Sequence, residues 1–182
     1  DGTYPQIAGQ LNTVIINQLT DIRARNRDNP IMYPFSVPRL FGGAQEIADV
    51  AAYISVLPMT PHNGLGPGRD LVLGEKLFRD VCVEFLGNHG EGDKREHIPA
   101  LRGQHYRYPV RQGELIRIGR RCNADPKTQK QIRAFSARDI HAVMDYTSRL
   151  RPPEDRVAES PSWHNPDFPN YVRPPMPLPL PD

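Results

Sequence analysis

The sequence predicts a helical protein that contains two similar units and ends in an extended tail. A Pro-x-apolar-x-Gly-Gln motif occurs twice, at residues 5–10 and at residues 99–104, ninety-four positions apart. A helical pattern of apolar residues follows each copy, and each unit closes with an amphipathic helix. Ten of the twenty prolines follow Arg151. We expect a first unit at 1–58, a linker at 59–70, a second unit at 71–151 and a tail at 152–182.

In the first unit, apolar residues at helical spacing predict a helix directly after Gln10. They are Leu11, Val14, Ile15, Leu19 and Ile22. Residues 28–43 are expected to be irregular. An amphipathic helix then covers 45–57, and Pro58 stops it.

The second unit repeats this order. A helix is expected to begin near Leu71, and a later helix follows Gln104, with Pro109 shortening or bending it near its start. Residues 122–135 are expected to be irregular. Ser136, with Asp139 three residues later, predicts the capped start of a final helix that runs to residue 150.

The tail contains too much proline for a helix and is expected to be extended. It is either a disordered tail or an arm that lies across a partner protein. Trp163, Phe168 and Tyr171 are spaced along it and are the candidate partner-binding residues.

Composition excludes some classes of protein. A net charge of +2 is too small to indicate nucleic-acid binding, and no apolar run is long enough for a transmembrane helix. Residues 61–150 carry 16 basic and 11 acidic side chains, which forms either a solvated basic face or a docking surface for an acidic protein. The chain begins at Asp1 without a Met or a signal-like segment, as expected of a processed or trimmed chain. Cys82 and Cys122 are either free thiols, which we expect, or the two halves of one disulfide.

One stretch, residues 74–93, organises the chain. It contains a Gly-Glu-Lys-Leu-Phe lead-in, Cys82, His89-Gly90 and an acidic, glycine-containing continuation. Covalent haem attachment uses Cys-x-x-Cys-His, in which two thiols bond the haem and the histidine binds iron. If Cys82 is the first thiol, Phe85 replaces the second and three residues are inserted before His89. If His89 is fixed instead, Phe85 and Asn88 occupy the thiol positions.

These motifs, in this order and duplicated, resemble the two-domain class I c-type cytochromes of bacterial periplasms, over about 150 residues. The resemblance implies an all-α fold of two cytochrome-c-like helical domains in tandem, each around one haem. It also implies transfer of single electrons between membrane complexes or enzymes.

The resemblance assigns haem-binding roles residue by residue. Cys82 matches the first thiol, His89 matches the proximal iron ligand, and Met32 lies close to the distal-ligand position of the first unit. Met32 is alternatively a core methionine. The corresponding loop of the second unit, 122–132, contains no Met, and the attachment motif of the first unit is expected before Pro5.

Two functions follow. The leading hypothesis is a haem-free accessory or structural subunit, in which Phe85 and Leu86 fill the haem site. It binds the periplasmic side of a membrane electron-transfer complex, peripheral to the inner membrane. The alternative is a periplasmic electron carrier that holds haem c through Cys82 and His89 or through a motif upstream of Asp1. The other histidines are scattered without metal-binding spacing, and no enzyme motif is found.

Overall fold

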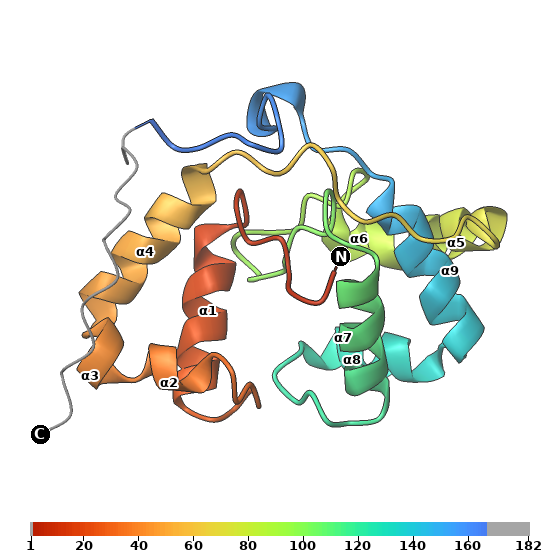
Figure 1. Ribbon diagram of the computed structural model, residues 1–182. Coiled ribbons are helices and arrows are strands. Elements are labelled where there is room, and N and C mark those ends of the chain that lie inside the picture. The colour runs from red at the N-terminus through yellow and green to blue at the C-terminus, as the bar shows by residue number, and fades with distance from the viewer. Residues whose placement is uncertain (1, 167–182) are drawn as a thin grey trace, which may run out of the picture.

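The computed structural model describes residues 2–166, and this part of the chain is helical, as predicted (Figure 1). The helices of the first unit are α1 (Asn12–Arg23), α2 (Tyr33–Ser36), α3 (Pro38–Phe41) and α4 (Ala44–Val56). Those of the second unit are α5 (Leu71–Leu77), α6 (Val83–Leu86), α7 (Arg107–Arg117), α8 (Pro126–Ala134) and α9 (Ala137–Ser148). Residues 2–166 contain isolated β-bridges but no strand.

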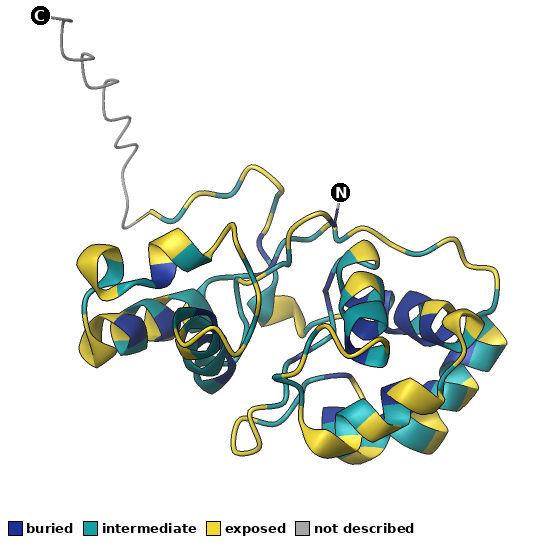
Figure 2. Ribbon diagram, turned by 90° about the horizontal axis from the view of Figure 1, so that it is seen from below, coloured by how far each residue is buried: buried dark blue, intermediate teal, exposed yellow. Residues whose placement is uncertain are grey.

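The two units lie side by side, with α1–α4 in one half of the molecule and α5–α9 in the other (Figure 1). In the first unit α1 packs against α4 and α2. In the second, α9 packs against α5 and α7, and α7 also contacts α8. Many buried positions, dark blue in Figure 2, lie on the second unit's helices.

The predicted caps of the helices can be checked atom by atom. The Ser136 hydroxyl accepts a hydrogen bond from the Asp139 N–H at 3.1 Å, and the Asp139 carboxylate accepts one from the Ser136 N–H at 2.9 Å. This confirms the capping box before α9. Asp125 caps α8 in a similar way, accepting from the N–H groups of Lys127 and Thr128, and was not anticipated.

The expectation that both loops are irregular was wrong. Residues 28–43 contain α2 and α3, and residues 122–135 contain α8. Prolines explain both differences, because each of these helices has a proline in its first two positions, where no N–H is needed. Pro109 likewise lies in the first turn of α7 and is accommodated there.

The repeated Gly-Gln pairs have the same conformation in both units. Gly9 and Gly103 have φ of +72° and +70°, a region that favours glycine. Their N–H groups donate to the carbonyls of Ile54 and Leu150, both at 3.0 Å. Both glycines also lie against Met59, whose side chain would meet a Cβ at either position within 3 Å. The duplication seen in the sequence is therefore a duplication of backbone structure.

The segments that precede and follow the second unit lie against each other. Met59 donates its N–H to the carbonyl of Arg156 at 2.7 Å and accepts from Ala158 at 2.8 Å. Further along, Gly68 donates to the carboxylate of Asp145 in α9 at 2.6 Å. Residues 59–70 are thus fixed along the second unit. Within residues 2–166, no helix has the length and apolar character needed to cross a membrane.

Candidate functional site

The stretch that resembles a haem-attachment motif is a helix followed by a tight turn. α5 continues through a π-helical turn at Phe78–Cys82 into α6, which ends at Leu86. Gly87 has φ of +76°, the conformation that commonly terminates helices. The chain then turns back, and the Gly92 N–H donates to the Leu86 carbonyl at 2.9 Å. The turn therefore holds Leu86 in one position.

Side chains of this stretch fill the interior of the second unit. Phe78, Cys82 and Leu86 are only 1%, 7% and 5% exposed. The same cluster contains buried residues of α7, α8 and α9, which are Ile116, Ile132, Ile140, Val143 and Met144. Phe85 is partly buried and packs against it. The interior is occupied by protein side chains.

The Cys82 thiol is part of this apolar core. Burial raises the pKa of Cys82 to about 12, because a thiolate loses its solvation there. The thiol is therefore neutral at ordinary pH, and its neighbours are hydrophobic. Cys82 behaves as a small core residue. Both Cys82 and Cys122 are free in the structure.

His89 lies outside the core. It is exposed, and its backbone N–H donates to the Glu91 carboxylate at 2.8 Å. Within residues 2–166 its imidazole has no hydrogen-bond or ion-pair partner. Cys82 therefore lies in the core and His89 in solvent, so the core does not contain both an attachment thiol and an imidazole for iron.

A third register of the motif, without any insertion, was missed in the sequence. Counting Cys-x-x-Cys-His-Gly from Cys82 puts Phe85 at the second thiol, Leu86 at the histidine and Gly87 at the glycine. The signal was the glycine spacing, since Gly87 and Gly90 match His-Gly-x-x-Gly with Leu86 as the first residue. In this register the side chain at the iron-ligand position is buried, as a ligand must be.

The second unit therefore does not fit covalently attached haem. Its attachment stretch offers one thiol, which is buried, and the interior of the unit has no imidazole. His105 and His141 instead accept or share hydrogen bonds with the Gly64 N–H at 2.8 Å and the Tyr106 hydroxyl at 2.7 Å. Residues 122–132, which contain no methionine, include the first turns of α8.

Met32 of the first unit is more exposed than Cys82 and Leu86 of the second. It lies at the start of α2, is 37% exposed, and donates its N–H to the Asn29 side chain at 3.1 Å. Ile31 and Phe35, on either side of it in the sequence, are 59% and 58% exposed. The region around Met32 thus presents several apolar side chains that the described part of the protein leaves accessible.

The last helices of the two units, α4 and α9, differ in how far other helices cover them. α9 is covered by α5, and Gly74 of α5 approaches so closely that a Cβ there would lie 2.1 Å from the Ala142 carbonyl. α9 has seven buried residues, whereas α4 has two, Ile47 and Ala51. Within residues 2–166, no helix covers α4 as α5 covers α9. In residues 2–166, α4 of the first unit is therefore more exposed than α9 of the second.

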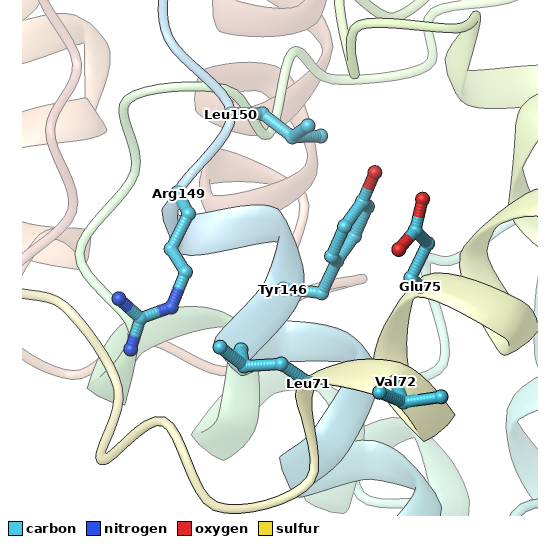
Figure 3. A pocket seen from close by; sticks show the side chains of 6 residues that line it. All are labelled: Leu71, Val72, Glu75, Tyr146, Arg149 and Leu150. Carbon is cyan, nitrogen blue, oxygen red and sulfur yellow. The ribbon is translucent and has the colours of Figure 1, made fainter.

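A shallow pocket in the second unit does not coincide with the attachment stretch. It has a volume of about 370 Å³ and lies between α5 and the end of α9 (Figure 3). Its lining residues are Leu71, Val72, Glu75, Tyr146, Arg149 and Leu150. Glu75 is paired with Arg79 and Arg149 with Asp145. With its charged groups already paired, this pocket offers no obvious site for a polar ligand.

The candidate partner-binding residues are only partly within the structure. Trp163 is half-buried. Asn165, close to it, donates to the Tyr53 hydroxyl of α4 at 3.0 Å. Phe168 and Tyr171 lie outside the described residues. No cluster of three or more potential metal-ligating side chains occurs in residues 2–166.

Comparison with known proteins identifies relatives over most of the chain. No protein-family model matches the sequence. Cytochrome c4 of Thiocapsa roseopersicina is 32% identical over 158 residues, covering 81% of this chain and 79% of the relative. Cytochrome c4 of Azotobacter vinelandii is 29% identical over 163 residues, covering 81% and 77%.

Solved structures agree with these matches. The crystal structure of reduced recombinant cytochrome c4 from Pseudomonas stutzeri is similar with a TM-score of 0.73 and 28% identity, covering 83% of this chain and 87% of that one. A cytochrome c4 from Acidithiobacillus ferrooxidans, at 21% identity and a TM-score of 0.69, shares the fold over 80% of this chain and 89% of that one. The tandem cytochrome-c fold expected from the sequence is thereby confirmed, and the chain belongs to the cytochrome c4 family.

Proposed function

We propose that this protein is a periplasmic electron-transfer protein in which the first unit is the haem-bearing one and the second unit has become a haem-free structural unit. The observation that carries the proposal is the contrast between the two units. Leu86 and Cys82 are buried in a filled core, whereas residues 2–166 leave Met32 and one face of α4 accessible.

The filled core supports the haem-free assignment of the second unit on energetic grounds. A large cavity in a protein core costs roughly 24 cal/mol for each cubic ångström that stays empty. Replacing ligand residues by bulky apolar ones removes this cost. Phe85 and Leu86 have suitable size and lie in or against the core.

The electron-transfer role is supported by the relatives, which are cytochromes over the whole matched length. They favour the electron-carrier hypothesis over a purely structural subunit. Met32 is the residue that would complete the iron coordination in the first unit. Haem supplies reversible one-electron chemistry when bound. The chain itself would contribute the sulfur of Met32 as an iron ligand and the apolar side chains around it. Residues 1–182 contain no thiol within the first unit, so covalent attachment there requires residues outside this stretch.

The partner is proposed to be a redox protein or a membrane-associated electron-transfer complex. The basic excess in residues 61–150 suits an acidic docking surface. No nucleic-acid partner is proposed.

Haem counting tests the assignment. The full-length protein is produced in a host that matures c-type cytochromes, denatured, and assayed for haem that remains with the chain. We expect one haem per chain, unchanged by Cys82→Ser or by the control Cys122→Ser. Two haems per chain would overturn the haem-free second unit, and no haem would overturn the electron carrier in favour of a structural subunit.

A further inference from the structure

The positive charge of the second unit is concentrated in one short stretch. Residues 61–150 carry 16 basic and 11 acidic side chains, and residues 115–134 contain 6 of the basic and 1 of the acidic ones. The rest of 61–150 therefore carries ten of each and is balanced. The whole excess of +5 belongs to the end of α7, the turn after it, and α8.

Most of these cations are exposed and lack an acidic partner. Arg117 is paired with Glu114 at 2.8 Å, and Arg121 is only partly exposed. The other four are exposed and form no ion pair within residues 2–166, and they are Arg120, Lys127, Lys130 and Arg133. The single acid of the stretch, Asp125, accepts from backbone N–H groups at the start of α8. The four positive charges therefore face solvent.

The four cations belong to one surface. Lys127, Lys130 and Arg133 recur every three residues, so they lie along one side of α8. α8 packs against α7, and a Cβ on Gly119, in the turn after α7, would lie 3.9 Å from Nη2 of Arg133. Ile118, beside Gly119 in the sequence, is 55% exposed. An exposed apolar side chain thus lies close to cations from both elements.

This surface adjoins the first unit. Asn123, in the turn between α7 and α8, donates to Asp21 of α1 at 2.8 Å and to Gln18 at 3.2 Å. In Figure 1 this turn and the segment between α1 and α2 both lie at the lower side of the molecule. That segment leads to Met32 at the start of α2. A protein bound over residues 115–134 would therefore lie next to the first unit.

We propose that Arg120, Lys127, Lys130 and Arg133, together with Ile118, form the docking surface for an acidic redox protein. A concentrated positive potential accelerates encounter with a negative surface and selects its orientation, and an apolar side chain supplies close contact once the partner has docked. The inference rests on the proposed function, because it gives the haem-free second unit the task of holding a partner beside the haem-bearing first unit.

An acidic protein fits this surface better than an anionic membrane does. Helices that bind membrane surfaces present large apolar side chains on the face opposite their cations. In α8 the residues between the cations are Thr128, Gln129 and Gln131, and Ile132 is buried in the core of the second unit. The helix therefore has no apolar face to insert into lipid.

Titration of the ¹⁵N-labelled full-length protein with the soluble domain of cytochrome b5, an acidic haem protein, tests the surface. At low ionic strength, saturable changes in NMR amide shifts should centre on residues 117–134 and weaken as salt is added. The double variant Lys127→Glu with Lys130→Glu should bind the probe about tenfold more weakly or less tightly still, because attraction becomes repulsion. Ile118→Ser should weaken binding severalfold.

Lys94→Glu with Arg95→Glu is the matched control. Both residues are exposed cations of the second unit outside the surface, and the variant changes the net charge by the same amount. It should bind the probe nearly as the unmodified protein does. Far-UV circular dichroism checks folding, and mapping on the unmodified protein tests the location of the surface even if a variant does not fold.

Three results would overturn the inference. They are amide shifts that are absent or centred elsewhere, equal weakening by the two double variants, and binding to phosphatidylglycerol vesicles without binding to the acidic probe, which would indicate a membrane surface instead. None of these measurements needs haem in the protein. Haem without docking would therefore contradict this inference alone, and docking without haem would contradict the electron carrier alone.

Discussion

Gln10 and Gln104 make the same pair of hydrogen bonds in opposite directions across the two units. The Gln10 amide accepts from the Ala100 N–H at 2.9 Å and donates to the Ala100 carbonyl at 3.0 Å. The Gln104 amide accepts from the Gln6 N–H at 2.7 Å and donates to the Gln6 carbonyl at 2.9 Å. Each glutamine thus hydrogen-bonds the backbone N–H and carbonyl of one residue in the other unit. The two bonded residues, Gln6 and Ala100, occupy equivalent positions of the repeat.

Removing either glutamine side chain should loosen the junction. Gln104→Ala is expected to lower the free energy of unfolding by about 1–3 kcal/mol, because two backbone groups lose their partner. Gln10→Ala should act in the same direction, with a smaller effect because Gln104 is 4% exposed and Gln10 is only half-buried. Urea unfolding measures both. Gln45→Ala, on the exposed face of α4, should change stability little, and an equally large loss there would contradict the role of the junction.

Leu86 should behave as a core residue. Leu86→Ala is expected to cost about 2–5 kcal/mol, because it leaves a cavity in a close-packed interior. Leu65→Ala is the control, since Leu65 is 46% exposed. Denaturant unfolding of the two variants should separate them clearly. Similar stability of both variants would show that the interior around Leu86 is not packed.

Two substitutions, at Phe85 and Leu86, should restore a haem-attachment motif. Phe85→Cys with Leu86→His recreates Cys-Val-Glu-Cys-His-Gly from Cys82 onward, and in a host that matures c-type cytochromes the double variant should gain one covalent haem. The mass of the denatured protein measures this gain. Phe85→Cys alone should gain none. No gain in a folded double variant would argue against the register without an insertion.

Cys82 should make stability depend on pH in the alkaline range. Its folded pKa, about 12, lies above its ordinary value of 9.0, so the unfolded chain loses the proton first. The stability associated with the neutral thiol is complete below pH 9 and is lost as pH rises toward 12, by up to about 1.4 kcal/mol per pH unit.

Comparison of unfolding at pH 8 and pH 10 measures this effect. Cys82→Ala should reduce the dependence on pH, and Cys122→Ser should leave it unchanged, because Cys122 is exposed. In the native protein a thiol reagent should label Cys122 and spare Cys82. Rapid labelling of Cys82 would show that the core opens readily.

Much of the fold was predictable because it rests on local signals. The capping pair Ser136 and Asp139, the prolines after the closing helices and the repeated Gly-Gln pairs each act over a few residues. The hydrogen bond from Arg27 to Gln112 of the other unit was not predictable, because it depends on how two distant segments meet. The short helices α2, α3 and α8 were missed because their apolar patterns are too brief for periodicity.

The candidate site was only partly predictable for a related reason. The loss of the second thiol is visible in the sequence at Phe85, but the burial of Leu86 and the exposure of His89 are not. Because histidine is the usual iron ligand, His89 was the natural candidate in the sequence. The register without an insertion places Leu86 at that position instead. Met32 remains a proposed ligand, and the Trp163, Phe168 and Tyr171 arm remains a prediction.

The closed interior around Leu86 has a kinetic consequence under the proposed assignment. A carrier with two redox centres can accept from a donor at one end and deliver to an acceptor at the other. With a single centre beside Met32, both encounters must use the same exposed edge, one after the other. Reduced donor and oxidised acceptor should therefore compete for the protein, and turnover should fall when either is in large excess.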